Sequence, residues 1–220
     1  SRIVNREFPV YPPKKLNEEQ INAYDKILDT KKSVSLLNGV TGSGKTEVYM
    51  NLVSYMLLLD KTCLILVPEI SLTPQMIERF KGRFGNDVAV FHSKLSTGER
   101  YDQWYRVKNR EVSLVIGTRS ALFLPFKDLG LIIVDEEHDR SYKSDMNPKY
   151  NTIEVCEFFA KIKGCKVVLG SATPSIESFY KALNGEYELV MINKRANNKK
   201  LPSVELVDMR EELKNNNKSI

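Results

Sequence analysis

Gly39-Val-Thr-Gly-Ser-Gly-Lys-Thr46 is the stretch that decides the fold class, and an apolar run, Val34–Leu37, leads straight into it. The eight residues match the pattern G-x-x-x-x-G-K-[ST], and apolar residues at helical spacing follow them. A strand, a glycine-rich turn and a helix in this order predict a phosphate-binding loop, or P-loop. A chance glycine-rich turn is the alternative, and it is weak because such a match arises by accident in on the order of 1% of chains this long.

The P-loop residues predict ATP and Mg²⁺ as ligands. The glycines allow successive backbone N–H groups to face a phosphate, and the start of the helix adds favourable partial charge. Lys45 is expected to reach the β- and γ-phosphates, and Thr46 to offer its hydroxyl to Mg²⁺. The P-loop residues expected to hold the nucleotide are Gly39, Thr41, Gly42, Ser43, Gly44, Lys45 and Thr46.

An acidic cluster supplies the second half of such a site. The apolar run Leu131–Val134 ends in Asp135-Glu-Glu-His138, which we name the acidic box. A carboxylate at the end of a neighbouring strand can hold Mg²⁺ through water, and a second can polarise the attacking water. We assign Asp135 to the metal and Glu136 to the general base, so that Lys45, Asp135 and Glu136 are the catalytic candidates. A solvated acidic turn is the alternative.

Short apolar runs that alternate with helical patterns predict an α/β fold, with a mostly parallel central sheet and helices on both faces. Several runs lack polar alternation, as expected of strands covered on both sides. The expected strands are Val34–Leu37, Cys63–Val67, Val88–Phe91, Ser113–Ile116, Leu131–Val134 and Lys166–Leu169, with a further strand-like run at Val204–Val207. Helices are expected from the stripe Val48, Leu52, Tyr55, Met56 and Leu59, over Thr73–Phe84, from Ser96, over Thr152–Ile162 and over Ser175–Leu183.

A chain of 220 residues suits one sizeable domain. We expect a lead-in segment at residues 1–15, the nucleotide-binding lobe at 16–193 and a polar segment at 194–220. The absence of an initiator Met and an ending without a cap favour a piece of a longer protein. Its apolar runs are too short for a transmembrane helix, which needs about 20 residues.

The net charge of +5 depends largely on Asn193–Lys200, whose four basic residues contribute +4. That run is typical of a solvated loop, and a DNA-binding patch is the alternative. Cys63, Cys156 and Cys165 form no CxxC pair, so we interpret them as reduced core thiols of a cytoplasmic protein.

Asp135-Glu-Glu-His138 resembles the DExH box of superfamily 2 helicases, whose ATP-binding lobe is RecA-like. Gln20 stands 19 residues before Gly39, where that superfamily places an adenine-reading glutamine; a helix-start residue is the alternative. Ser171-Ala-Thr173 matches the motif that links hydrolysis to DNA contact, and its hydroxyls could bond the acidic box, including His138. A helix cap before Pro174 is the alternative.

The residues within and around these motifs are more specific than the motif patterns alone, and they resemble the PriA family of bacterial replication-restart helicases. The resemblance covers roughly Leu16 to Arg210, and only the segment after Tyr150 departs, because it lacks an expected Arg-Asp pair near Ile153-Glu154. The strings that carry it are Gly39–Tyr49, Val67-Pro-Glu-Ile-Ser-Leu-Thr-Pro-Gln75, Phe91-His-Ser, Gly98-Glu-Arg100, Gly117-Thr-Arg-Ser-Ala-Leu-Phe123, Asp135-Glu-Glu-His-Asp139, Ser141-Tyr-Lys143 and Gly170-Ser-Ala-Thr-Pro-Ser-Ile-Glu-Ser178.

The resemblance implies a 3′→5′ DNA helicase that acts at stalled forks and in primosome assembly. It implies single-stranded and forked DNA, single-strand-binding protein and other primosome proteins as partners, with no membrane. It also implies a second lobe and a zinc module elsewhere in a longer protein, so that this chain alone should bind nucleotide weakly and be nearly inactive. An ATP-gated DNA-binding loading platform and a double-strand DNA translocase are the alternatives.

Two loops are expected to hold DNA, because each follows a strand and offers free N–H groups and hydroxyls to phosphates. They are Pro68–Gln75 and Gly117–Ser120, and their candidate residues are Ser71, Thr73, Thr118, Arg119 and Ser120. For Arg119 the alternative is a surface ion pair. By resemblance, the loop with Tyr142 and Tyr150 senses DNA and signals to the ATP site, and packing of these aromatics on their own domain is the alternative.

Overall fold

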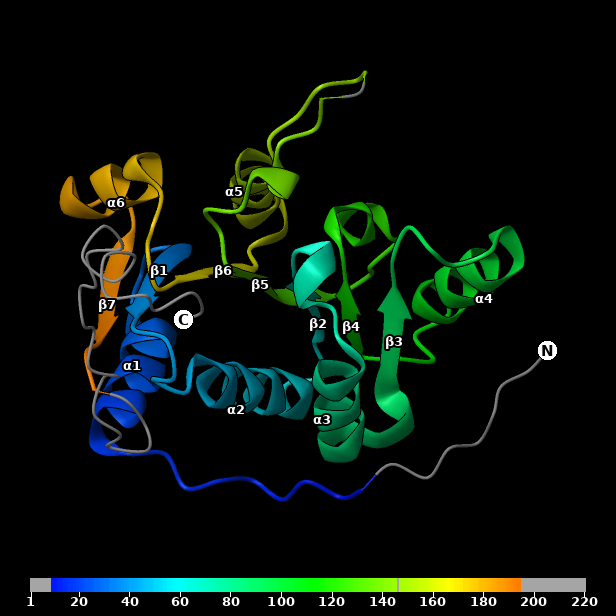
Figure 1. Cartoon of the computed structure of the whole chain (residues 1–220), viewed down its shortest axis with the longest axis horizontal. Helices are drawn as coiled ribbons and strands as arrows, with labels where there is room; N and C mark the ends of the chain where they lie inside the picture. Colours follow the sequence, from blue (N-terminus) through cyan, green and yellow to red (C-terminus); the bar gives the residue numbers. More distant parts are fainter. Residues whose placement is uncertain (1–8, 146, 195–220) are drawn as a thin grey trace, which may run out of the picture.

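A seven-stranded sheet forms the centre of the computed structural model, which describes residues 9–145 and 147–194 (Figure 1). The strands lie in the order β3-β4-β2-β5-β6-β1-β7, and every neighbouring pair is parallel. The predicted fold class is therefore confirmed. The strands are β1 Val34–Gly39, β2 Thr62–Leu66, β3 Val88–Phe91, β4 Leu114–Gly117, β5 Leu129–Asp135, β6 Lys166–Ser171 and β7 Glu188–Ile192.

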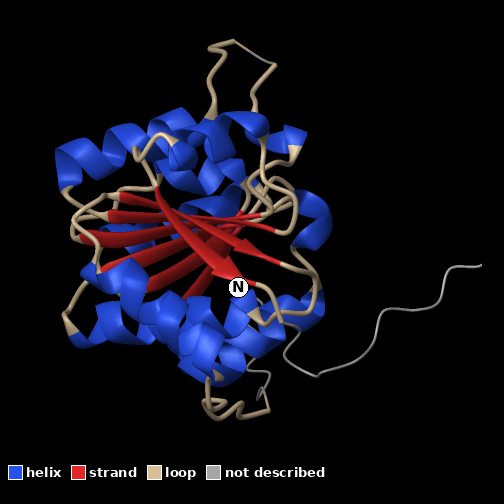
Figure 2. Cartoon of the chain, turned by 90° about the vertical axis from the view of Figure 1, so that its left-hand side faces the viewer, coloured by secondary structure: helices blue, strands red, loops and turns tan. Residues whose placement is uncertain are grey.

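Helices cover both faces of the sheet (Figure 2). One core lies between the sheet and α1, α2 and α3, and the other between the sheet and α4, α5 and α6. All five residues of β2 are buried, because side chains on both faces of the strand enter one of these cores. The helices are α1 Glu18–Asp29, α2 Lys45–Leu58, α3 Pro74–Phe84, α4 Thr97–Lys108, α5 Thr152–Lys163 and α6 Ile176–Leu183.

Short 3-10 turns and side-chain caps set the helix ends. Ser96 caps α4 and forms the expected capping box with Glu99, while Thr73 and Ser175 are the N-caps of α3 and α6 rather than helical residues. The 3-10 turns are η1 Glu69–Ser71, η2 Gly85–Asp87, η3 Arg119–Phe123 and η4 Arg140–Tyr142.

The prediction for α2 was wrong in its details. The helix ends at Leu58, so Leu59 lies outside it, and Tyr55 is exposed. The buried face instead includes Tyr49 and Val53, to one side of the expected stripe.

Strand β7 was not predicted. It is a five-residue edge strand that pairs with β1 and follows the polar stretch after α6. The predicted strand-like run at Val204–Val207, and nearly all of the polar segment 194–220, lie outside the described residues. Cys63, Cys156 and Cys165 are buried free thiols, as expected. Among the described helices none is both long and apolar enough to cross a membrane.

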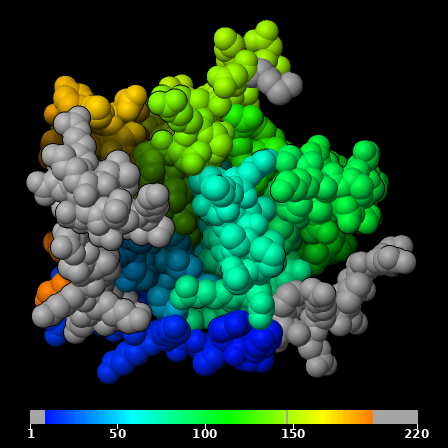
Figure 3. Space-filling view, viewed as in Figure 1, coloured from blue at the N-terminus to red at the C-terminus, as the bar shows by residue number. Residues whose placement is uncertain are grey.

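The described part of the lead-in segment runs in extended form beneath the helices of one face, as the blue line at the lower edge of Figure 1 and the band of blue atoms at the lower edge of Figure 3 show. The backbone N–H of Tyr11 donates to the carbonyl oxygen of Gly82 on α3 at 3.0 Å. A side chain at Gly82 would collide with the backbone oxygen of Pro9, so the glycine permits this close crossing. The segment thereby brings Lys14 and Lys15 to the P-loop side of the sheet.

Candidate nucleotide-binding site

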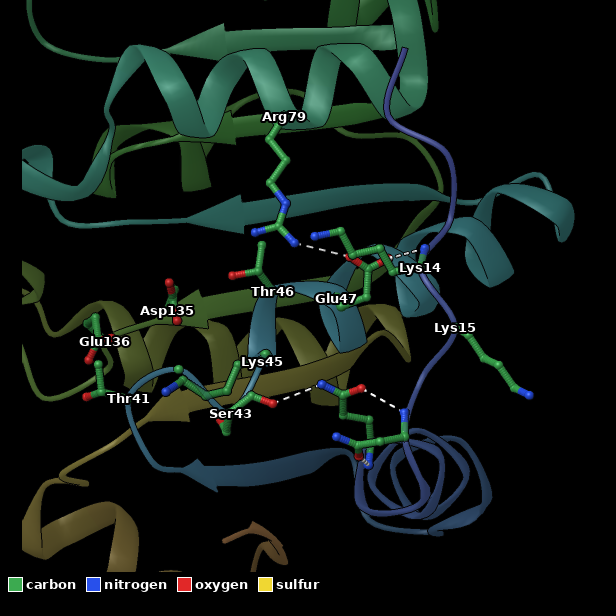
Figure 4. Close-up of a pocket in the computed structure, with 14 residues that line it drawn as sticks. Lys14, Lys15, Thr41, Ser43, Lys45, Thr46, Glu47, Arg79, Asp135 and Glu136 are labelled. Atoms are coloured by element: carbon green, nitrogen blue, oxygen red, sulfur yellow. Dashed lines mark hydrogen bonds and ion pairs between the residues drawn. The ribbon is translucent and has the colours of Figure 1, made fainter. Parts of the chain in front are cut away.

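The P-loop and the acidic box meet at the carboxyl edge of the sheet, where they line one pocket of about 500 Å³ (Figure 4). Parallel strands place their carboxyl ends on one edge, and β6 separates β5 from β1. Every predicted nucleotide-binding residue lines this pocket except Gly39, and Asp135 and Glu136 line it too. Five residues that the sequence analysis did not select also line it: Lys14, Lys15, Asn17, Glu47 and Arg79.

Three glycines shape the P-loop. Gly42 and Gly44 have φ angles of 80° and 82°, a region that side chains rarely adopt. Gly39 has another role, since an added Cβ would lie 2.8 Å from the Oγ atom of Ser43. Ser43 is fully buried, and its hydroxyl has no partner within the described chain. The loop therefore depends on glycine for both conformation and space.

Lys45 begins α2 and bends back over the loop. Its Nζ atom donates to the carbonyl oxygen of Gly39 at 2.7 Å. An ammonium group has three donors, so this single bond leaves capacity for phosphate oxygens. Thr46, the next residue of α2, lines the same pocket. Both side chains line the pocket, and their contacts with phosphate and Mg²⁺ stay predictions.

Asp135 ends β5 with its side chain in the pocket. Its Oδ1 atom accepts a hydrogen bond from the Tyr49 hydroxyl at 2.9 Å. Burial raises the pKa of the Asp135 carboxyl above its ordinary value, while the bond from Tyr49 and the charge of Lys45 act in the opposite direction. Thr46 and Asp135 together provide a hydroxyl and a carboxylate, the oxygen ligands that suit Mg²⁺.

Glu136 follows in a left-handed backbone conformation, with φ of 48°. Such a conformation is uncommon for a residue with a side chain and often occurs at functional sites. It turns the chain sharply at the end of β5, and the Glu136 side chain lines the pocket beside Asp135. The two carboxylates therefore line the same pocket, and both are half-buried.

Gln20 has two partners within the chain. Its Oε1 atom accepts from the Asn17 backbone N–H at 2.9 Å and completes the capping box of α1, so the helix-start role is real. Its Nε2 atom donates to the carbonyl oxygen of Ser43 at 2.9 Å, which fixes α1 to the P-loop. Gln20 lines the pocket, and its contact with adenine remains a prediction.

Residues 17–182 match the family model described as DEAD/DEAH box helicase. The chain belongs to the DEAD/DEAH box helicase family. Among curated proteins it is 51% identical over 220 residues to "Replication restart protein PriA" of Bacillus subtilis, which covers 98% of this chain and 27% of that protein. The protein of the same name from Synechocystis is 48% identical, covering 84% of this chain and 23% of that protein. The resemblance to the PriA family is thereby confirmed, and the chain spans about a quarter of the length of these relatives.

Solved structures confirm the RecA-like helicase fold. RecG bound to a three-way DNA junction aligns with a TM-score of 0.63 at 23% identity, over 93% of this chain and 27% of that chain. The Hef helicase domain of Pyrococcus furiosus aligns with a TM-score of 0.59 at 21% identity, over 81% of this chain and 38% of that chain. At these identities the likeness concerns the fold alone.

The acidic box of this helicase lobe contacts the strand end that carries Ser171. The Nδ1 atom of His138 lies 2.7 Å from the Ser171 hydroxyl, which also accepts from the Thr173 backbone N–H at 3.0 Å. The expected link between the two motifs is therefore present in the geometry. The Thr173 side chain is exposed.

Glu137 is a buried carboxylate that the sequence analysis missed. It accepts hydrogen bonds from the backbone N–H and hydroxyl of Ser175 at 2.7 and 3.0 Å, and from the Ser178 hydroxyl at 2.9 Å. Glu137 thereby fixes the start of α6 to the acidic box. The two serines three residues apart, after a box with a third acid, were the available signal.

A second missed cluster lies beside the P-loop. Glu47, in the first turn of α2, pairs with Arg83 at 2.9 Å and with Arg79 at 3.1 Å, both on α3. The Lys14 backbone N–H also donates to Glu47 at 3.3 Å. Figure 4 shows Arg79 reaching toward Glu47 beside Thr46. The spacing of the two arginines, one helical turn apart, was the signal in the sequence.

The two tyrosines of the loop after the acidic box have different surroundings. Tyr142 is buried, as the packing alternative expected, and its hydroxyl donates to the carbonyl oxygen of Asp135 at 2.7 Å. Tyr150 is half-buried and meets Phe123 edge-on, with ring centroids 5.2 Å apart. Burial raises the pKa of the Tyr142 hydroxyl well above its ordinary value, so it remains a donor.

Arg119 supports this loop from η3. It donates to the carbonyl oxygens of Ser141 and Lys143 at 3.0 and 2.8 Å, and its guanidinium lies 5.7 Å from the ring centroid of Tyr150. These partners are neither the carboxylate of the ion-pair alternative nor a phosphate. The arginine therefore connects one predicted DNA loop to the loop that follows the acidic box.

The two predicted DNA loops lie side by side, because β2 and β4 are paired and both loops leave their carboxyl ends. Ser71 belongs to η1, whereas the Thr73 hydroxyl accepts from the Met76 backbone N–H at 3.3 Å as a helix cap. Thr118 is buried, and Ser120 is exposed. The loops are thus adjacent, and their contact with DNA stays a prediction.

Proposed function

We propose that this chain is the ATP-binding lobe of an ATP-dependent DNA helicase that restarts stalled replication forks. The supporting observation is that the P-loop and the acidic box line one pocket in a chain 51% identical to a replication restart protein. The proposal includes 3′→5′ movement, forked and single-stranded DNA as substrate, and a cytoplasmic location. It also includes single-strand-binding protein and other primosome proteins as partners.

The residues of the pocket suggest how ATP is held. The P-loop backbone and Lys45 bind the β- and γ-phosphates, and Gln20 reads the adenine from the α1 side. Thr46 and Asp135 hold Mg²⁺, which when bound neutralises charge on the phosphate oxygens. Glu136 lies beside Asp135 at the same edge of the pocket and orients and deprotonates the attacking water.

Contacts between the loops support a coupling of the ATP site to DNA. His138 and Ser171 connect the acidic box to the end of β6, and Arg119 connects the Gly117–Ser120 loop to the chain after the box. A change at the nucleotide can therefore reach the loops whose hydroxyls and N–H groups bind backbone phosphates. Tyr142 connects the loop after the acidic box to Asp135 directly, since its hydroxyl donates to the Asp135 carbonyl oxygen.

We place zinc binding outside this region. Within residues 9–145 and 147–194 no group of three His, Cys, Asp or Glu side chains could hold a metal ion. The three cysteines are buried in the cores, apart from the pocket. In this proposal zinc belongs to another part of the protein.

The experiment that tests the proposal measures strand separation of a synthetic fork by the full protein, with ATP and without it. ATP-dependent unwinding that is lost in Lys45→Ala is expected. ATP hydrolysis without any strand separation would favour an ATP-gated loading platform instead. Triplex displacement without unwinding would favour a double-strand translocase.

A further inference from the structure

Tyr49 lies one helical turn after Lys45 on α2, the helix that begins at the P-loop. Its side chain is buried, with 1% relative exposure. The hydroxyl donates to the Oδ1 atom of Asp135 at 2.9 Å, across 86 positions of sequence. One helix therefore carries both a phosphate-binding lysine and a donor to the carboxylate assigned to Mg²⁺.

The strand between them leaves room for this contact. Gly170 on β6 is the register partner of Asp135 on β5. A Cβ atom at residue 170 would overlap the Tyr49 hydroxyl and would lie 2.9 Å from its Cζ atom. Glycine is needed here for space, because its φ is not among the positive values. The phenol therefore reaches Asp135 over a strand position that no larger residue permits.

Asp135 is also held through its backbone. The Tyr142 hydroxyl donates to the Asp135 carbonyl oxygen at 2.7 Å, so two buried tyrosines hold the residue from separate elements. The carboxylate group itself accepts from the Tyr49 hydroxyl and from the adjacent Glu136 backbone N–H, and of these two donors only Tyr49 comes from another element. The bond from Tyr49 is made to Oδ1 of a carboxylate that lines the pocket.

We propose that Tyr49 is a positioning residue for Mg²⁺ binding, and that Gly170 is the residue that permits it. The inference rests on the proposed function, since it requires the nucleotide to bind with Mg²⁺ at this pocket. A fixed carboxylate binds metal more tightly than a free one, because less conformational freedom is lost. Loss of a hydrogen-bond partner behind a metal ligand typically lowers metal affinity about 10- to 100-fold.

Tyr49→Phe tests the proposal, because it removes only the hydroxyl. The readout is binding of a non-hydrolysable ATP analogue by calorimetry, without Mg²⁺ and across a Mg²⁺ titration. We expect the Mg²⁺ concentration that gives half of the maximal increase in analogue affinity to rise about 10- to 100-fold. The affinity for the analogue without Mg²⁺ should be unchanged. Tyr55→Phe is the matched control, since Tyr55 lies on the same helix but is exposed.

Gly170→Ala is an independent test. It should raise the Mg²⁺ requirement by a similar factor. The double variant with Tyr49→Phe should show no further rise, because both changes remove the same contact between Tyr49 and Asp135. An unchanged Mg²⁺ requirement in Tyr49→Phe would overturn the proposal. Equal loss of metal-free affinity, additive effects in the double variant or failure of Tyr49→Phe to fold would also overturn it. If the unaltered chain shows no Mg²⁺-dependent binding, the proposed function itself fails.

Discussion

Glu47→Ala is a stringent test of the ion-pair cluster beside the P-loop. The Glu47 side chain is 7% exposed, and that of Arg83 is 6% exposed, at a distance of 2.9 Å. Removal of the carboxylate leaves the Arg83 guanidinium buried without its charged partner. The Arg79 side chain is 37% exposed, so water can solvate its guanidinium in place of the Glu47 carboxylate.

The expected loss in the free energy of unfolding follows from this difference in exposure between Arg83 and Arg79. Breaking a buried ion pair by removing one partner costs roughly 3–5 kcal/mol. The exposed pair with Arg79 adds at most about 1 kcal/mol. We therefore expect a loss of about 3–6 kcal/mol in the free energy of unfolding, which at about 2–4 °C per kcal/mol lowers Tm by roughly 6–24 °C.

The assay is urea unfolding followed by far-ultraviolet circular dichroism. Glu177→Ala is the control, because its ion pair with Lys143 spans 3.9 Å and both side chains are mostly exposed; its cost should stay below about 1 kcal/mol. The double variant Glu47→Leu/Arg83→Met should recover most of the loss, since it leaves no buried charge. A loss below about 1 kcal/mol for Glu47→Ala, or no recovery in the double variant, would refute the reasoning.

The remaining predictions concern the site itself. Lys45→Ala should weaken nucleotide binding at least about 10- to 100-fold by calorimetry, because a charged donor to phosphate is lost; unchanged affinity would sink the P-loop assignment. Glu136→Gln should keep ATP binding in the full protein and slow turnover by about 10²–10⁴-fold, while Asp135→Asn should raise the Mg²⁺ requirement; normal hydrolysis by both variants would show that these roles are wrong. Arg119→Ala should raise the DNA concentration for half-maximal ATPase stimulation about 10-fold, and an unchanged value would count against its role at the DNA loops.

Motif residues were predictable because each motif is local. The P-loop lies within eight consecutive residues, and its strand and helix follow directly on either side. Strands β2 and β4 are buried on both faces and so appear as continuous apolar runs. Strand β7 was missed although it contains a run of the same kind, Leu189–Ile192.

Contacts between distant elements were not predictable. Tyr49 and Asp135 are 86 positions apart, and Glu47 and Arg83 are 36 apart. Their pairing depends on how α2, α3 and β5 pack, and the helical spacing of the two arginines does not identify their partner. Glu137 illustrates the same limit, because the spacing of the two serines does not say which of three adjacent acids the fold buries.

A structure of this chain with Mg²⁺ and a non-hydrolysable ATP analogue is the most direct test of the central claim. We expect phosphates over Gly42–Thr46, Mg²⁺ near Thr46 and Asp135, and the Lys45 ammonium group bonded to the β- and γ-phosphates. A nucleotide bound at another place, or phosphates at the loop without contact to Lys45, would contradict the proposed function.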